Sequence, residues 1–293
     1  MVNQISWPVH ILHKFAESFH KHRFMQEGAS ASLRKPAILY SCAVSRKAYP
    51  LPWVTLGSPC WSTVSLPIRC LSPHNLLTTS CLAFTPDHPF PTQLRQANAA
   101  LSFLLNKGIS PANIAIGGDS AGGSLIMQLA SHILHPLPSI PPPPVLGQAL
   151  AGAVLISPWC FYGVDAPSYT RNNSKDLIPA CAYEFFTRYA RQGLPPESQH
   201  YCEPHSTPLE WWKRLDGVYA RVLITAGEYE CPFDQIVETS AMISRYVKDT
   251  TTVIDPGGVH DELIVKFATG GGGIGKDYDA MVGFLSRSLQ SGN

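Results

Sequence analysis

A serine flanked by glycines is the residue in this chain best placed to do chemistry. The pentapeptide Gly118–Asp119–Ser120–Ala121–Gly122 has the form G-x-S-x-G. Apolar residues 114–116 before it predict a buried strand, and residues 121–134 after it predict a helix. In that setting the pattern marks a nucleophilic serine, and the backbone N–H of Ala121 faces the oxyanion formed on the attacked acyl group. Without its flanking elements, the pattern would also fit a glycine-rich turn with a solvent-facing serine.

A serine hydroxyl needs a general base, and the base needs a carboxylate that orients it. Both would follow the serine, acid first and histidine second, at the carboxyl ends of later strands. One later predicted strand is followed by Glu228, Glu230 and Asp234, and the last predicted strand by a loop containing His260. We assign His260 as the general base and Glu230 as its carboxylate. Glu228 leaves its strand early and Asp234 falls in the next helix, and these two acids remain rivals of Glu230.

Composition narrows the class of protein. The chain has 293 residues, of which 45% are hydrophobic, and this is enough for one large α/β core. A net charge of +1 gives no indication of a nucleic-acid partner. The eight cysteines include no C-x-x-C pair, which argues against zinc and thioredoxin-like sites. No apolar run of membrane-spanning length and no secretory segment occurs, so we expect a cytoplasmic protein without a stable membrane anchor.

Strands and helices alternate along most of the chain, which predicts a mostly parallel sheet with helices on both faces. We expect a single α/β domain over residues 1–293, in which residues 160–218 interrupt the alternation and form a cap. In the N-terminal region, residues 1–30, an amphipathic helix over 5–24 is expected to pack on the body, although its basic polar face also fits a membrane surface. The predicted strands are 36–40, 114–116, 151–156, 221–225 and 251–254, and the predicted helices are 92–107, 121–134, 233–246 and 277–289.

Four segments resemble the hormone-sensitive-lipase-like branch of the α/β-hydrolases. They are Pro86–Pro91, the doubled glycines of Gly117–Gly123, Gly227–Asp234 and His260–Glu262. The similarity spans roughly residues 82–289 and looks most like fungal members, some of which serve natural-product pathways. It implies hydrolysis of a small-molecule carboxylic ester, often acetyl or short acyl, without a metal or other cofactor. It also implies the triad of Ser120, His260 and Glu230.

One segment departs from that family. Its members carry His-Gly-Gly-Gly after the strand that here begins near Ile38, and the backbone N–H groups of that motif complete the oxyanion hole. In this chain Tyr40 is followed by residues 41–45 without glycine, and no glycine run precedes Gly117. Loss of one oxyanion donor costs about 10²–10³ in rate. Residues 28–86 also contain no Asp or Glu. We hypothesise a shifted reading frame or a mis-spliced gene model between about Ser41 and Ser80, which transcript sequencing would test.

Two other functions fit the same residues. The first is a catalytically impaired small-ligand binding protein, which the missing glycine motif favours. The second is a biosynthetic acyltransferase or lactonase that uses the same triad. Aromatic residues of the cap are expected either to line the substrate pocket or simply to pack the cap, namely Phe161, Tyr162, Trp211 and Trp212. The sequence leaves the acyl-chain length and the oligomeric state open.

Overall fold

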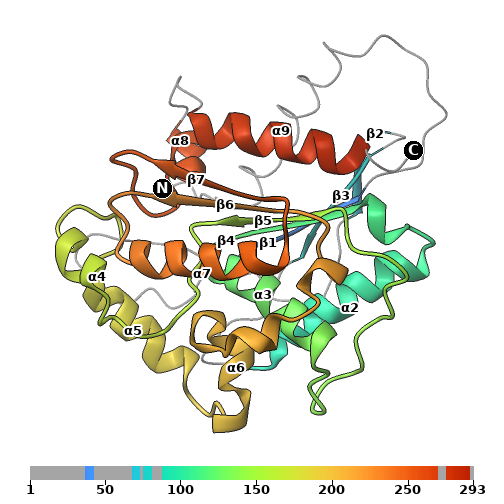
Figure 1. The fold of residues 1–293 in the computed structure, drawn as a ribbon, viewed down its shortest axis with the longest axis horizontal. Coiled ribbons are helices and arrows are strands. Elements are labelled where there is room, and N and C mark those ends of the chain that lie inside the picture. The colour runs from blue at the N-terminus through green and yellow to red at the C-terminus, as the bar shows by residue number, and fades with distance from the viewer. Residues whose placement is uncertain (1–36, 43–67, 73–74, 81–87, 270–274, 291–293) are drawn as a thin grey trace, which may run out of the picture.

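A seven-stranded sheet forms the centre of the protein (Figure 1). The computed structural model describes residues 37–42, 68–72, 75–80, 88–269 and 275–290. The strand order is β2-β3-β1-β4-β5-β6-β7, and every neighbouring pair is parallel except β2 with β3. This confirms the α/β class and the mostly parallel sheet. The strands are β1 (Ala37–Cys42), β2 (Ile68–Ser72), β3 (Asn75–Ser80), β4 (Ile114–Asp119), β5 (Gly152–Ile156), β6 (Val222–Gly227) and β7 (Thr250–Asp255).

Helices lie on both faces of the sheet. Figure 1 shows α2, α3 and α7 below it and α9 above it. The helices are α2 (Thr92–Asn106), α3 (Ala121–Leu134), α4 (Pro167–Asn172), α5 (Ala180–Ala190), α6 (Gln199–Cys202), α7 (Phe233–Tyr246), α8 (Glu262–Thr269) and α9 (Lys276–Gln290). Two of these helices, α3 and α7, have the bounds that apolar periodicity predicts.

The strand side chains alternate between two cores because successive residues of a strand point to opposite faces of the sheet. Ile114 and Ile116 of β4 pack with α2 and α3, whereas Ala115 packs with α9. All six residues of β4 are buried, as expected for a central strand covered on both faces. The strand that carries the candidate nucleophile is therefore held from both sides.

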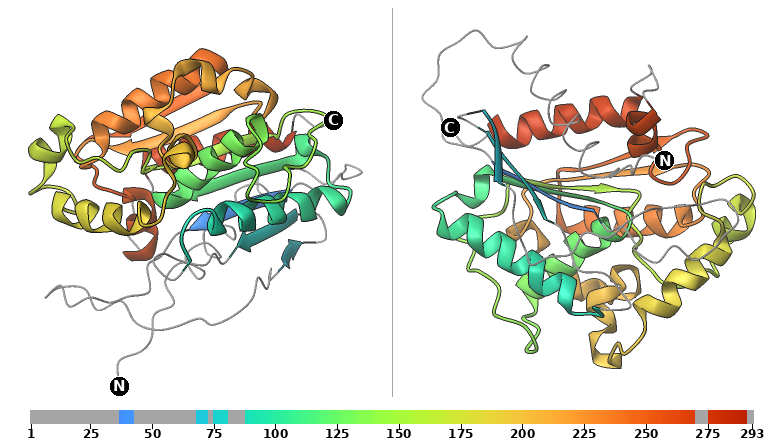
Figure 2. Two further views of the ribbon diagram at one scale, coloured as in Figure 1. Left: turned by 90° about the horizontal axis from the view of Figure 1, so that it is seen from below. Right: turned by 180° about the vertical axis from the view of Figure 1, so that it is seen from behind.

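The segment 160–218 contains the short helices α4, α5 and α6, and Figures 1 and 2 show α4 and α5 beyond one end of the sheet. A separate aromatic cluster lies there, in which Tyr162, Tyr169 and Tyr183 of the segment are buried together with Trp159, the residue just before it. Ring contacts link these side chains; Trp159 and Tyr162, for example, have centroids 4.6 Å apart. This segment thus has its own apolar core beside the sheet.

The two adjacent tryptophans are not part of that cluster and pack in or against the main core instead. Trp212 is fully buried in the main core, and Trp211 stacks on His135 and donates to the Ser131 hydroxyl. Ser131 follows Ser120 by eleven residues, which places it about 16 Å along α3 at about 1.5 Å per residue. The Trp211 ring therefore anchors the C-terminal part of α3, whereas the Trp212 Nε1–H donates to the Thr207 hydroxyl.

Six of these elements were not predicted from the sequence, namely β2, β3, α4, α5, α6 and α8. The strands β2 and β3 are short and lack a clean apolar alternation, so pairing with neighbouring strands determines them more than their own residues do. The predicted helix over residues 5–24 and most of the segment 41–67 lie outside the described residues. For the described helices, none combines the length and the apolar character needed to cross a membrane.

Candidate active site

Ser120 occupies a sharp turn between β4 and α3. Its backbone has φ 50° and ψ −117°, a conformation that costs a non-glycine residue free energy. Its N–H donates to the carbonyl of Ile156 at 2.9 Å, and its carbonyl accepts from the Trp159 N–H at 3.0 Å. A Cβ at Gly123 would lie 2.7 Å from the Pro158 Cβ, so only glycine lets α3 approach this closely. The end of β5 and the residues after it therefore hold the turn in place.

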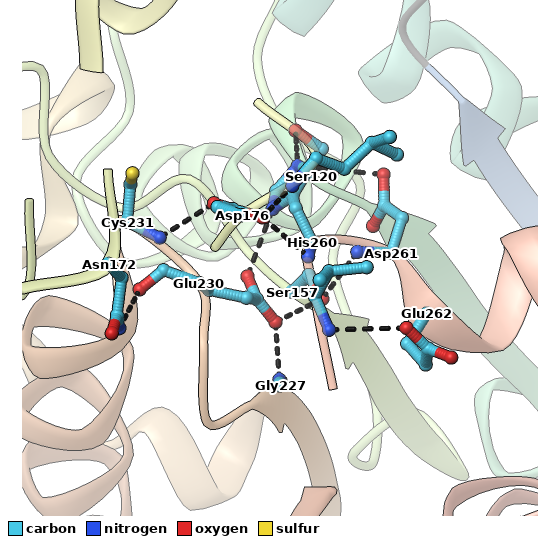
Figure 3. Close-up of polar contacts among 12 residues, drawn as sticks. Ser120, Ser157, Asn172, Asp176, Gly227, Glu230, Cys231, His260, Asp261 and Glu262 are labelled. Carbon is cyan, nitrogen blue, oxygen red and sulfur yellow. Dashed lines mark hydrogen bonds and ion pairs between the residues drawn. The ribbon is translucent and has the colours of Figure 1, made fainter. Parts of the chain in front are cut away.

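Three residues from different strand ends form one hydrogen-bonded chain (Figure 3). The Ser120 Oγ lies 2.9 Å from His260 Nε2, and His260 Nδ1 lies 2.9 Å from Glu230 Oε2. The imidazole of His260 is 1% exposed and the carboxylate of Glu230 is fully buried. Ser120 follows β4, Glu230 follows β6 and His260 follows β7. The carboxyl ends of neighbouring parallel strands meet at one edge of the sheet. This explains how residues so distant in sequence come together.

The second oxygen of Glu230 is also fixed. Its Oε1 accepts from the Ser157 hydroxyl at 2.7 Å and from the Gly227 N–H. The Ser157 oxygen in turn accepts from the Asp261 N–H at 3.1 Å. These bonds compensate the cost of burying the carboxylate and leave Oε2 aimed at the imidazole. Sequence reasoning missed Ser157, although its position directly after the predicted strand 151–156 places it at the edge where the site forms.

The two rival acids point elsewhere. The Glu228 carboxylate accepts from the Gly257 N–H at 2.9 Å. The Asp234 carboxylate accepts from the Ser168 N–H at 2.8 Å and pairs with Arg171 at 2.7 Å. The structure therefore brings Glu230, rather than Glu228 or Asp234, against the candidate base.

With this geometry in view, comparison with known proteins identifies the family. Residues 82–264, more than half of the chain, match a family described as alpha/beta hydrolase fold. The chain belongs to the α/β-hydrolase fold family. The family expected from the sequence is therefore confirmed.

Individual relatives are distant. An acetyl-hydrolase from Streptomyces hygroscopicus is 31% identical over 96 residues, covering 32% of this chain and 28% of that protein. The chain spans about half the length of the other curated relatives it matches, 51% and 47%. A carboxyl esterase 2 structure from the fungus Tuber melanosporum has a TM-score of 0.66 at 16% identity, covering 88% of this chain and 80% of that one. A hormone-sensitive lipase structure from a metagenome library has a TM-score of 0.64 at 18% identity, covering 89% and 80%.

A further carboxylate lies beside the imidazole of this α/β-hydrolase. Asp261 has φ 55°, and its Oδ2 is 3.5 Å from His260 Nε2, the nitrogen that bonds to Ser120 (Figure 3). Burial lowers the pKa of His260, but the charges of Asp261 and Glu230 raise it more, to about 10. Burial raises the pKa of the Asp261 carboxyl. The site thus favours a protonated imidazole, the form that cannot accept a proton from serine.

A candidate oxyanion donor lies at the start of α3. Ala121 is the first residue of that helix, and the first N–H groups of a helix have no acceptor within it. The helix dipole also favours negative charge at this end. From the sequence we also expect a second, unidentified oxyanion donor near residues 41–58, and all of that segment except residues 41 and 42 lies outside the described residues.

The residues around Glu230 and His260 indicate whether a thiol nucleophile or a metal ion could act at this site. Burial raises the pKa of the Cys231 thiol, next to Glu230 in sequence, to about 12, so this thiol stays protonated and is a poor nucleophile. The Tyr183 ring meets the His260 ring edge-on at a centroid distance of 5.8 Å. Across the described part of the chain, no group of His, Cys, Asp and Glu side chains is arranged to hold a metal ion.

Proposed function

We propose that this protein is a serine carboxylester hydrolase that acts on acetyl or other short acyl esters. The observation that carries the proposal is the continuous hydrogen-bonded chain from Ser120 through His260 to Glu230. The α/β-hydrolase family and the name of the Streptomyces hygroscopicus relative support ester hydrolysis. The strained backbone of Ser120 is what an exposed nucleophile on a strand-to-helix turn requires.

In the acylation step, neutral His260 takes the proton of the Ser120 hydroxyl as its oxygen attacks the ester carbonyl. The new C–O bond forms while the carbonyl π electrons move to oxygen, and the Ala121 N–H stabilises that oxyanion. The tetrahedral intermediate then expels the alcohol, which receives its proton from His260. Glu230 keeps the imidazole in the required tautomer and stabilises its protonated form.

In the deacylation step, water replaces the alcohol. His260 removes a proton from the water, whose oxygen attacks the acyl carbon bound to Ser120. A second tetrahedral intermediate collapses, the acid leaves, and the serine oxygen regains its proton from the imidazole. Tyr183, whose ring meets that of His260, belongs to the proposed cap and would limit the size of the bound acyl or alcohol group.

The wider assignment follows from the same reasoning. We treat the chain as one α/β-hydrolase domain in which residues 160–218 form the cap over the substrate, a small-molecule ester. Phe161 and Tyr162 remain the sequence-predicted pocket residues in that cap. That this hydrolase acts in a fungal natural-product pathway stays a prediction from the sequence resemblance.

Hydrolysis of p-nitrophenyl acetate and butyrate tests the proposal. Ser120→Ala should abolish it, and a fluorophosphonate probe should add its phosphonyl group, with loss of fluoride, to the parent protein but not to this variant. Equal hydrolysis by the variant and the parent would disprove the mechanism. The missing glycine motif favours a catalytically impaired binding protein as the second candidate, and an unlabelled parent would support it. Ester formation from an added alcohol would instead identify an acyltransferase.

A further inference from the structure

A short segment of the cap is bonded to the loop that carries Glu230. Asn172 is buried at the end of α4, and its Nδ2 donates to the carbonyls of Glu228 and Glu230 at 3.1 and 2.8 Å. The buried Ser168 hydroxyl donates to the carbonyl of Cys231 at 2.6 Å. These contacts fix the backbone of the acid loop from the cap side.

Asp176, just beyond α4, contacts both the loop that carries Glu230 and the loop that carries His260. Its Oδ2 accepts from the Cys231 N–H at 2.6 Å, and its Oδ1 accepts from the His260 N–H at 2.8 Å (Figure 3). The Leu177 N–H also donates to Oδ1 at 2.7 Å, which holds the carboxylate against its own backbone. The Asp176 side chain therefore joins the backbone of Cys231, the residue after Glu230, to the backbone of His260.

The position of this bridge matters because the proton path depends on short distances. The Glu230–His260 and His260–Ser120 contacts are both 2.9 Å, and a misplacement of about 1 Å in such a constellation can cost about 10²-fold in rate. Hydrogen bonds from backbone N–H groups to a carboxylate are roughly twice as strong as neutral ones. Asp176 is thus suited to set the spacing of the two loops.

We propose that Asp176 is a positioning residue that couples the cap to the triad by holding the Glu230 and His260 loops in register. The inference rests on the proposed function, because it assigns a role in that same reaction. Asp176 bonds to the backbones of two neighbours and does not touch the reacting oxygen, while its charge is a smaller cause of the raised pKa of His260. Its effect therefore falls on the chemical step rather than on substrate binding.

Three variants separate positioning from general stability. Asp176→Asn retains one carbonyl oxygen but replaces the other acceptor with an NH₂ group, so one of the two loops loses its bond. Ser168→Ala removes a bond from the same cap segment to the acid loop and leaves the His260 loop untouched. Asp216→Asn removes one negative charge from an exposed site in the same segment of the chain.

The measurements are kcat and KM for p-nitrophenyl acetate, the rate of fluorophosphonate labelling and the thermal midpoint. In Asp176→Asn we expect kcat and the labelling rate to fall together by about 10- to 100-fold, with KM changed by less than about 2-fold. Ser168→Ala should lower the thermal midpoint but keep kcat within about 3-fold. Asp216→Asn should match the parent in all four measurements.

Parental kcat in folded Asp176→Asn would overturn the proposal, and so would an equal loss of kcat in Ser168→Ala. If Asp176→Asn does not fold, Asp176→Glu keeps the charge but shifts the carboxylate by one methylene group. It should label at least about 10-fold more slowly, and a parental labelling rate would overturn the proposal. Ser120→Ala distinguishes the two claims: if it retains parental activity the proposed function fails, whereas if it is inactive the failure concerns Asp176 alone.

Discussion

Replacement of Asp261 by asparagine should extend the activity of this protein to lower pH. His260 must be neutral to accept the serine proton, and activity is therefore lost as pH falls through its pKa. The Asp261 charge favours the protonated imidazole and is one cause of the pKa of about 10. Asp261→Asn removes that charge, so the pKa of His260 falls and the acid limb of the pH profile moves down.

The size of the shift follows from the separation of the two groups. The Asp261 Oδ2 is 3.5 Å from His260 Nε2. At that distance two unit charges interact by about 1 kcal/mol in water and by about 5 kcal/mol at an effective dielectric constant of about 20. Since one pH unit corresponds to about 1.4 kcal/mol, the limb should move by about one to three pH units. The Asp261 side chain is 19% exposed, which places the site between these limits.

The assay is kcat/KM for p-nitrophenyl acetate between pH 5 and 10, beside the pH dependence of fluorophosphonate labelling, which reports acylation alone. Asp216→Asn serves as the control because it removes the same charge at an exposed position. An unchanged acid limb in Asp261→Asn would refute the reasoning, because it would mean that Asp261 is already uncharged where His260 titrates. A shift of equal size in Asp216→Asn would refute it as well.

Three further predictions concern the same site. Glu230→Gln should lower kcat by about 10⁴-fold, since an amide cannot hold the tautomer, and a loss below tenfold would contradict the assigned acid. Ser157→Ala removes a bond to the buried Glu230 carboxylate and should lower the free energy of unfolding in urea by about 1–3 kcal/mol, whereas an unchanged midpoint would mean that water replaces the hydroxyl. Gly123→Ala places a Cβ 2.7 Å from Pro158 and should cost about 1–3 kcal/mol in the same assay, unless the backbone relaxes and the parental midpoint persists.

The sequence by itself determined the elements that carry the site. Helices α3 and α7 have the predicted bounds because apolar periodicity and turn residues act within a few positions along the chain. The turn at Ser120 could be predicted for the same reason, since the strand and the helix that flank it adjoin it directly in the sequence. The order of strands then placed the candidate acid and base at the edge of the sheet where that turn lies.

Only the tertiary structure decided which side chains meet there. Three acids follow β6 within seven residues, and local pattern does not reveal which one faces the imidazole. That depends on the register of β6 against β7, on Ser157 from β5, and on Asp176, whose carboxylate bonds to a backbone 84 residues away in sequence. The two tryptophans show the same limit, since the bond of Trp211 to α3 and the burial of Trp212 in the main core depend on how distant segments pack together. Contacts between distant segments arise from packing and not from periodicity, so the chain carries no local signal for them.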